Sequence, residues 1–411
     1  MTTTPMTPLR LDPAGSDLRA ETALLHRRGP ACPVELPGGV TAWAITGHDL
    51  LKELLTDDRV SKDPRRHYPL FQAGLPPEAS WLMSWIGVTN MFTAYGADHR
   101  RLRRLVAPAF TARRIQAMAG DIEEIATGLL DAMAEEAGRE GTVDLIGGYA
   151  HPLPLEVICR LMGVPDDLRP SAVELIGRVM DTTLSPEEAQ ATFEAIPVVL
   201  GGLIERKREQ PGEDMTSVLI STSDEDGSRL SGEELLYTLL LVIGAGFETT
   251  VNLIGNAAHA LLTHPDQHEL VRNGTHTWDD VIEETLRGAP SVANLPLRYA
   301  VEDIPLDGGT VIAKGDAILA GLLAANTDPG HYGPDAEQFD LAREDKNHLA
   351  FGHGVHHCIG APLARLEARI ALPALFGRFP GLHLAAEPEP TVSCLTYGWG
   401  RLMVAPGTSG D

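Results

Sequence analysis

Cys358 is the clearest candidate for a metal ligand in this 411-residue chain, because it stands where a glycine-containing loop runs into a predicted helix. It follows a loop that contains Gly352, while Gly360 and Pro362 lead from it into a run of strong helix formers. A thiolate there would face the free N–H groups and the positive dipole end of that helix, so we expect a lowered pKa for Cys358. Such a sulfur could hold a soft metal and leave the opposite coordination position open. A buried, inert cysteine is the alternative.

A second set of unusual residues interrupts the long apolar run 235–262, which predicts a buried helix. Gly244, Ala245, Glu248 and Thr249 stand in its middle, where glycine, a carboxylate and a β-branched alcohol are all unfavourable. Local rules that are broken together indicate a functional site. A threonine that bonds back into the helix, beside small residues, can bend it and open a groove for a ligand. For Glu248, a buried salt bridge is the alternative to a functional role.

Basic residues gather on a predicted helix that begins near residue 98. His99 and Arg103 are four residues apart, so they share one helical face and suit a pair of carboxylates; a solvated basic face is the alternative. Other basic residues nearby predict a positively charged patch that could dock an acidic partner. These residues are Arg100, Arg101, Arg104, Arg113 and Arg114.

The remaining segments predict the frame around these groups. Residues 33–45 indicate a β-hairpin around a Pro-Gly-Gly turn, and residues 173–208 indicate two long helices. Residues 62–90 lack periodicity and predict a long loop, which in a compact protein is usually a lid or a binding loop. Glu284 and Arg287 are three residues apart on a predicted helix, so they can pair on one face.

Four motifs occur in order along the chain: His99-x-x-x-Arg103, Ala245-Gly-x-Glu-Thr, Glu284-x-x-Arg287 and Phe351-x-x-Gly-x-x-x-Cys358-x-Gly. In these motifs the chain resembles the cytochromes P450, in particular the soluble bacterial haem-thiolate monooxygenases of the actinobacterial type. The resemblance implies a mainly α fold with small β-sheets, in which residues 1–411 form one haem-enclosing unit. It also implies haem b (iron protoporphyrin IX) as cofactor, with Cys358 as the axial ligand of its iron.

The same resemblance implies roles for other residues. Glu248 and Thr249 would deliver protons during oxygen activation, and Glu284, Arg287 and Arg343 would stabilise the fold near the haem. The residues expected to hold the haem are His99, Arg103, Ala245, Arg298, Phe351, Gly352, His356 and Gly360. The residues expected to line the substrate pocket, several of which core packing would explain equally well, are Met83, Val88, Met91, Phe92, Val179, Met180, Leu240, Gly244, Val292, Ala293, Leu295, Tyr397 and Trp399.

Composition argues against several classes of function. Lys and Arg total 33 against 57 Asp and Glu, a net charge of −24, whereas nucleic-acid binding needs a basic surface. We find no run of the ~18 apolar residues that span a bilayer and no apolar signal core, which predicts a cytoplasmic protein without a membrane partner. The four cysteines include no Cys-x-x-Cys pair, so neither a disulfide framework nor a structural zinc site is expected.

The expected reaction is insertion of one oxygen atom from O2 into a C–H or C=C bond of a hydrophobic small molecule, such as a steroid, a macrolide or another secondary metabolite. No reductase sequence is fused to the chain, so electrons should come from a separate ferredoxin and an NAD(P)H-dependent ferredoxin reductase. The protein itself is expected to be a monomer. One alternative is oxidative coupling of two radicals into a C–C or C–O bond. Another is a haem sensor without catalysis, which would need no proton relay such as Glu248 and Thr249.

Overall fold

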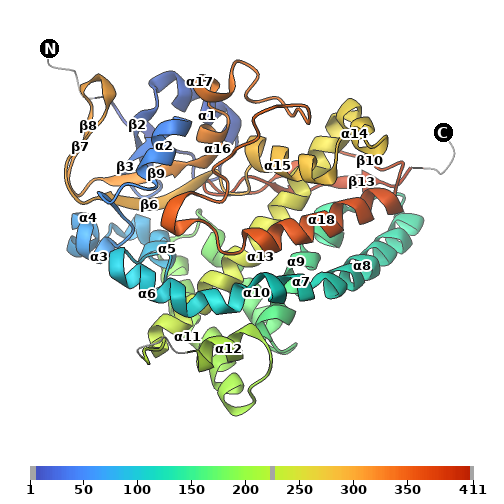
Figure 1. Cartoon of the computed structure of the whole chain (residues 1–411), viewed down its shortest axis with the longest axis horizontal. Coiled ribbons are helices and arrows are strands. Elements are labelled where there is room, and N and C mark those ends of the chain that lie inside the picture. The colour runs from blue at the N-terminus through green and yellow to red at the C-terminus, as the bar shows by residue number, and fades with distance from the viewer. Residues whose placement is uncertain (1–5, 223–226, 408–411) are drawn as a thin grey trace.

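The structure is a computed structural model of the chain, and it describes residues 6–222 and 227–407. Helices dominate, as the sequence predicts; the strands of the largest sheet lie at the left of Figure 1, whereas β10 and β13 of a separate small sheet lie at the right. The α-helices are α1 Leu18–Arg28, α2 His48–Leu54, α3 Pro64–His67, α4 Pro69–Ala73, α5 Met83–Ile86, α6 Gly96–Val106, α7 Ala112–Ala117, α8 Ala119–Glu140, α9 Pro152–Met162, α10 Arg169–Met180, α11 Pro186–Glu209, α12 Met215–Ser221, α13 Gly232–Thr263, α14 Pro265–Arg272, α15 Trp278–Gly288, α16 Leu322–Asn326, α17 Pro329–Tyr332 and α18 Ala361–Arg378. Shorter turns of helix are η1 Pro77–Leu82, η2 Ala107–Phe110, η3 Ile146–Ala150, η4 Asp307–Gly309 and η5 Gly354–His356.

The largest sheet has the order β1-β2-β3-β9-β6-β4 and combines parallel with antiparallel pairs. The predicted hairpin is confirmed as β2 and β3, which are paired from Ala31↔Ile45 to Leu36↔Val40. The strands of this sheet are β1 Leu9–Arg10, β2 Ala31–Leu36, β3 Val40–Ile45, β4 Val60–Ser61, β6 Asn294–Ala300 and β9 Ala317–Gly321. The strands of the smaller sheets are β5 Val143–Asp144, β7 Ile304–Pro305, β8 Val311–Ile312, β10 His383–Leu384, β11 Glu389–Pro390, β12 Trp399–Arg401 and β13 Met403–Ala405.

Helix α13 runs through the main hydrophobic core and organises the packing of the helices around it. It starts with a capping box, in which the Ser231 hydroxyl accepts from the Glu234 backbone N–H and Glu234 accepts from the Ser231 N–H. Its neighbours in the core include α9, α15 and α18. By length and mean hydropathy α13 could cross a membrane, but 72% of its most apolar window is buried inside the protein, as expected of a core helix.

The prediction of a long loop over residues 62–90 is wrong. The segment folds into α3, α4, η1 and α5, which are short helices joined by tight connections. Asp63 caps α3 by accepting from the Arg65 and Arg66 N–H groups, and prolines at the starts of α3, α4 and η1 preset their first turns. Helices of four to six residues are too short for a periodic apolar pattern to mark them in the sequence.

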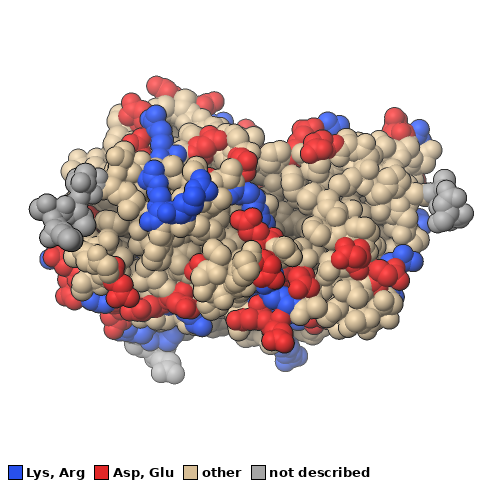
Figure 2. All heavy atoms as spheres, turned by 90° about the horizontal axis from the view of Figure 1, so that it is seen from above, with Lys and Arg blue, Asp and Glu red and all other residues tan. Residues whose placement is uncertain are grey.

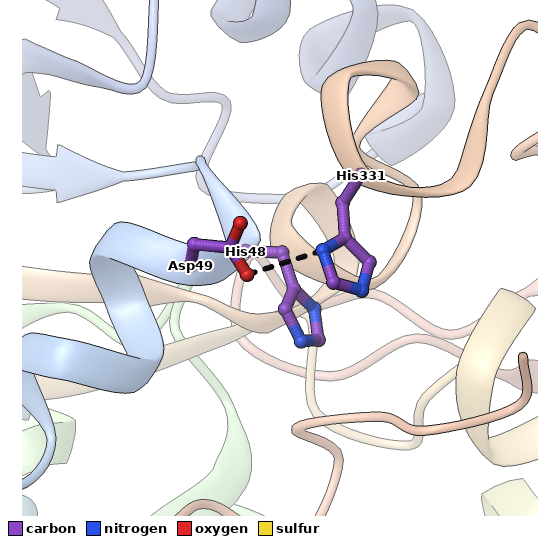
Figure 3. Close-up of side chains that lie close together, drawn as sticks. All are labelled: His48, Asp49 and His331. Carbon is purple, nitrogen blue, oxygen red and sulfur yellow. Dashed lines mark ion pairs between the residues drawn. The ribbon is translucent and has the colours of Figure 1, made fainter.

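His48, Asp49 and His331 lie together where α2 meets α17 (Figure 3). Asp49 Oδ1 is 3.1 Å from His331 Nδ1, and the two imidazole rings stack with centroids 3.9 Å apart and planes at 19°. The lone pair of a ring nitrogen lies in the plane of its ring, so two nearly parallel stacked rings cannot direct lone pairs at one ion. The cluster therefore fastens α2 to α17. Burial lowers the pKa of His48 to about 4, so this ring is neutral at pH 7.

Candidate active site

One large apolar cavity lies between α13, the loop that ends at Cys358, and the segments that carry most of the predicted pocket residues. It is lined by Cys358, by the Glu248–Thr249 pair of α13 and by the four basic residues that we expect to hold the haem. These residues come from distant parts of the sequence. The predicted pocket residues that line this cavity are Val88, Met91, Phe92, Val179, Met180, Leu240, Gly244, Val292 and Leu295.

The loop before α18 holds Cys358 with its sulfur toward the cavity. The Cys358 N–H donates to the Phe351 carbonyl over 2.8 Å, which closes the loop on itself. Gly352 has φ +69° and Gly354 has φ +70°, a left-handed backbone that favours glycine. At Gly354 a Cβ would also lie 2.9 Å from the Leu55 carbonyl oxygen. These two glycines therefore determine the loop shape that presents the sulfur.

The pKa of Cys358 differs from the sequence expectation. The Gly360 and Ala361 amides at the start of α18 act on the sulfur and lower the pKa, as predicted, and the charges of Arg103 and Arg365 act in the same direction. Burial opposes them and is the larger effect, so the pKa of the free thiol is raised. The side chain is exposed only in the sense that it borders the cavity. A thiolate at this position therefore needs a bound cation such as a metal ion.

Four of the predicted haem-holding residues form a basic cluster at the edge of the cavity: His99, Arg103, Arg298 and His356. The His99 and His356 rings lie with centroids 4.0 Å apart, and Arg298 is 5% exposed. The Nη1 atom of Arg298 and Nε2 of His99 are buried without a hydrogen-bond partner. Burial lowers the pKa of Arg298 to about 10 and that of His99 to about 4, and burial with the neighbouring charges strongly lowers that of His356.

The basic cluster supplies the test of whether the site suits haem. Within the described residues, no carboxylate forms an ion pair with any member of the cluster. Arg298 is a buried cation without a carboxylate partner, and Arg103 lies half-buried in the same cluster, so an anionic ligand would offset the cost of burying positive charge here. Haem b carries two carboxylates on one edge and an iron that accepts a thiolate. The donors, the cysteine and the apolar cavity between them fit this group. The remaining predicted haem contacts, Ala245, Phe351, Gly352 and Gly360, border the same cavity.

The middle of α13 faces the cavity with Thr249 and Glu248. The Thr249 hydroxyl donates to the Ala245 carbonyl over 2.7 Å, the bond back into the helix that the sequence predicts. Ser291 donates to the Thr249 carbonyl over 2.6 Å and so gives this backbone oxygen a side-chain partner. Burial raises the pKa of Glu248, and in the described residues no cation pairs with it. The structure therefore does not contain the salt bridge that was the alternative for Glu248.

Glu284, Arg287 and Arg343 come together in one buried network. Arg287 donates to both Glu284 oxygens, over 2.8 and 2.7 Å, and also to the carbonyls of residues 326, 336 and 338. Arg343 lies 3.3 Å from Glu284 Oε1. Both charges of the Glu284–Arg287 pair are fully buried. The network ties α15 to the segment that leads into the cysteine loop.

Four predicted pocket residues do not line the cavity. Met83 bends back over Gly87, where a Cβ would lie 2.5 Å from the Met83 Cε. Ala293 is 1% exposed and packs with Leu18 and Leu323. The other two are Tyr397 and Trp399, which line a separate, smaller cavity.

The pocket positions predicted for Tyr397 and Trp399 are therefore wrong, because their turn lies beside the far half of α13. There Arg19 Nε donates to the Tyr397 hydroxyl over 3.1 Å. Trp399 stacks on His259 with ring centroids 4.2 Å apart.

The basic patch predicted around α6 also needs one correction. Arg101 forms an ion pair with Glu234 of α13, so its positive charge is compensated within the protein and adds little to a docking surface. Arg100 and Arg113 are exposed, and the Arg114 guanidinium reaches the Glu213 carbonyl. Figure 2 shows, on the face seen from above, one larger group of basic side chains and several smaller ones among scattered acidic groups, so the net charge of −24 leaves local basic surface.

Three residues of the site escaped sequence reasoning. Arg365 lies over the Phe351 ring at 4.6 Å and pairs with Glu283, whose pKa falls to about 2 because the stabilising contacts of Arg365 and His348 outweigh its burial. Lys62 is buried at the edge of the basic cluster. Ser291 supports Thr249. Arg365 follows Cys358 in a helical run, which is a usable signal, but nothing local marks Lys62 or Ser291.

Comparison with known proteins places the chain in a family. The family model for cytochrome P450 matches residues 187–394. The chain is 43% identical to a 2-hydroxy-5-methyl-1-naphthoate 7-hydroxylase of Streptomyces carzinostaticus, with 93% of each chain covered. It is 39% identical to the 6-deoxyerythronolide B hydroxylase of Saccharopolyspora erythraea, covering 99% of this chain and 98% of the other. The solved structure of CYP154A1 from Streptomyces coelicolor A3(2) is 52% identical, covers 97% of this chain and 100% of its own, and superposes with a TM-score of 0.91.

The chain belongs to the cytochrome P450 family. It is an oxidoreductase, a monooxygenase with haem b as its cofactor, and it uses O2, a hydrophobic substrate and redox partners. The predictions of family, fold class, cofactor and enzyme class are confirmed. The alternative of a haem sensor without catalysis is not supported, because the chain is a monooxygenase. Because the relatives are hydroxylases, oxygen insertion is favoured over radical coupling.

Proposed function

We propose that the protein inserts one oxygen atom into a C–H or C=C bond of an apolar secondary metabolite, with a polyketide-derived ring system as the class to test first. The relatives named above include a hydroxylase of 2-hydroxy-5-methyl-1-naphthoate and a hydroxylase of 6-deoxyerythronolide B, which supports this class. The apolar lining of the cavity, with Met91, Val179, Met180 and Leu295, suits a substrate bound by shape and burial rather than by charge.

The observation that carries the proposal is that Cys358 and the Glu248–Thr249 pair line one cavity from different elements. Cys358 would hold the haem iron through its sulfur, and the basic cluster would bind the haem carboxylates. When bound, haem supplies O2 activation and two-electron oxidation, which a thiolate ligand favours by donating electron density. Glu284, Arg287 and Arg343 would keep the cysteine loop in register without touching the cofactor.

Proton delivery is the part assigned to α13. The Thr249 hydroxyl would hold a water molecule at the reacting face, and Glu248 would exchange protons between that water and the solvent. The raised pKa of Glu248 supports this role, since a carboxyl group that titrates nearer neutrality can both take up and give back a proton. Gly244 and Ala245 leave room for substrate against the helix backbone.

The same proposal covers the electron donors, the oligomeric state, the location and the partners of the protein. Electrons would come from a separate ferredoxin and an NAD(P)H-dependent ferredoxin reductase, with docking at the exposed basic residues of α6 and α7. Residues 1–411 would act as one haem-enclosing unit, as a monomer in the cytoplasm, with neither a nucleic acid nor a membrane as partner. The burial of α13, the apolar helix with the length to span a membrane, supports the last of these points.

Product analysis with surrogate redox partners tests the function. The purified holoenzyme is first screened for compounds that displace water from the haem iron, and each hit is then incubated with ferredoxin, reductase, NADPH and ¹⁸O-labelled O2. We expect a product heavier by one labelled oxygen atom. Products that form a new C–C or C–O bond without label would support radical coupling instead, and binding without turnover of any hit would contradict the proposal.

A further inference from the structure

Lys62 is a buried cation outside every motif that the sequence analysis used. It follows β4 directly and is 3% exposed. Its ammonium nitrogen lies 3.3 Å from the centre of the Phe92 ring and 3.4 Å from the Pro296 carbonyl, a long hydrogen bond. No carboxylate of the described residues pairs with it. Burial and the charge of Arg298 hold the pKa of Lys62 well below its usual value.

The sheet register sets Lys62 opposite Arg298. Strands β4 and β6 are antiparallel with Val60↔Ala300 and Ser61↔Tyr299, and Lys62 and Arg298 are the residues that come next on the two chains, one step beyond the last pair. Directly opposed residues of an antiparallel pair project on the same face, and like charges there are destabilising. Both side chains are nearly fully buried, so water does not screen this repulsion. The charge of Lys62 also acts on His356 of the basic cluster.

A fold that sets two buried cations face to face needs an anion between or beside them. The basic cluster already requires the carboxylates of haem, and Lys62 adjoins two of its members, Arg298 and His356. Lys62 is not among the residues that line the cavity; the Phe92 ring, which does line it, covers the ammonium group. The charge of Lys62 therefore lies behind the cavity wall, where it acts on Arg298 and His356 of the basic cluster.

We propose that Lys62 is a further haem-anchoring residue, which pairs beside Arg298 with a carboxylate of the cofactor. The inference rests on haem binding by this family. In this role Lys62 offsets the carboxylate charge and slows release of the cofactor, while the Pro296 carbonyl and the Phe92 ring hold the ammonium group in place. A charged hydrogen bond of this kind contributes enough to change a dissociation rate by about tenfold or more.

The test compares holoenzyme variants by haem loss and by reduction potential. Lys62→Met removes the charge and keeps the length of the side chain, Lys62→Arg keeps the charge, and Lys52→Met removes an exposed lysine of α2 as the matched control. Haem transfer to excess apomyoglobin should be about tenfold faster in Lys62→Met and within about twofold of wild type in the other two. The potential of Lys62→Met should shift to more negative values, because losing a nearby positive charge disfavours the reduced haem.

Two results would overturn the assignment. One is haem loss from Lys62→Met within about twofold of wild type. The other is faster loss with an unchanged potential and no rescue by Lys62→Arg, which would give Lys62 a packing role only. If Lys62→Met lacks the carbon monoxide band of a thiolate haem, Lys62→Gln takes its place and is judged by the same two readouts. Wild type that lacks this band would refute Cys358 ligation, a separate failure.

Discussion

The two sides of the cavity are held by different kinds of interaction. On the cysteine side, left-handed glycines, a closed loop and the buried Glu284–Arg287 pair determine the backbone. On the roof, Val179 and Met180 end α10, while Val88 and Phe92 come from the turns between α5 and α6, and these side chains meet through apolar contact. Changes on the cysteine side should therefore act on the cofactor, and changes on the roof should act on the choice of substrate.

The largest expected effect is at Cys358. Cys358→His should abolish the red-shifted Soret band that the reduced, carbon monoxide-bound wild type shows, because imidazole donates less electron density to iron than thiolate does. Monooxygenase activity should vanish with it. Absorption spectra of the reduced carbon monoxide complex check this, with circular dichroism to confirm folding. An unchanged Soret band in the variant would refute the assignment of the ligand.

The next effect in size is on stability, at the network behind the cysteine loop. Arg287→Ala leaves the Glu284 carboxylate buried without its partner, which should lower the free energy of unfolding by about 3–5 kcal/mol. Arg208→Ala removes a partner from the exposed pair with Glu205 and should cost less than about 1 kcal/mol. Urea unfolding of the holoenzyme, followed by circular dichroism, measures both. Equal losses in the two variants would contradict the distinction between a buried and a surface pair.

The same contrast explains what the sequence could predict. Cys358, His99 and Arg103 stand in motifs of fixed spacing, so the sequence could predict that they meet at one site, and all three line the same cavity. The short helices of residues 62–90 give no periodic signal. Met83 resembles any other pocket methionine in sequence, and only the fold shows that it covers Gly87.

The burial of a side chain by segments that are distant in the sequence could not be predicted either. The expectation of a lowered pKa at Cys358 counted the α18 amides, which are local in sequence, but the larger effect of burial depends on the whole chain. The opposition of Lys62 and Arg298 likewise depends on a strand pairing between residues more than 230 positions apart in the sequence.

On the reacting face, Thr249→Ala should separate electron use from product formation. The variant keeps the cavity and loses the hydroxyl, so substrate binding and NADPH consumption should change little, whereas electrons are diverted into hydrogen peroxide. Product yield should fall by about 10²-fold or less, the range for one positioned proton donor. Thr249→Ser keeps a hydroxyl and serves as the control. Full coupling of NADPH to product in Thr249→Ala would rule out the relay.

A smaller effect is expected on the roof. Met180→Ala removes apolar contact at the end of α10 and should change the substrate dissociation constant by about tenfold, while the carbon monoxide spectrum stays that of wild type. Val198→Ala, at an exposed position of α11, is the matched control. Spectral titration with a substrate measures both. A disturbed Soret band in Met180→Ala would show that roof and cofactor are not independent.

The smallest expected effect lies outside the cavity, at the exposed basic residues of α6 and α7. Arg100→Glu combined with Arg113→Glu should slow reduction by an acidic ferredoxin a few-fold at low salt, and the difference should shrink as salt screens exposed charges. Arg101 is unsuitable for this test, since its loss would also free Glu234 of α13. Arg208→Glu, on α11, is the matched reversal and should leave the rate unchanged. Stopped-flow reduction at two ionic strengths measures the effect. Equal slowing with dithionite would mean that the change had reached the haem site itself, and the separation between docking surface and cysteine side would then fail.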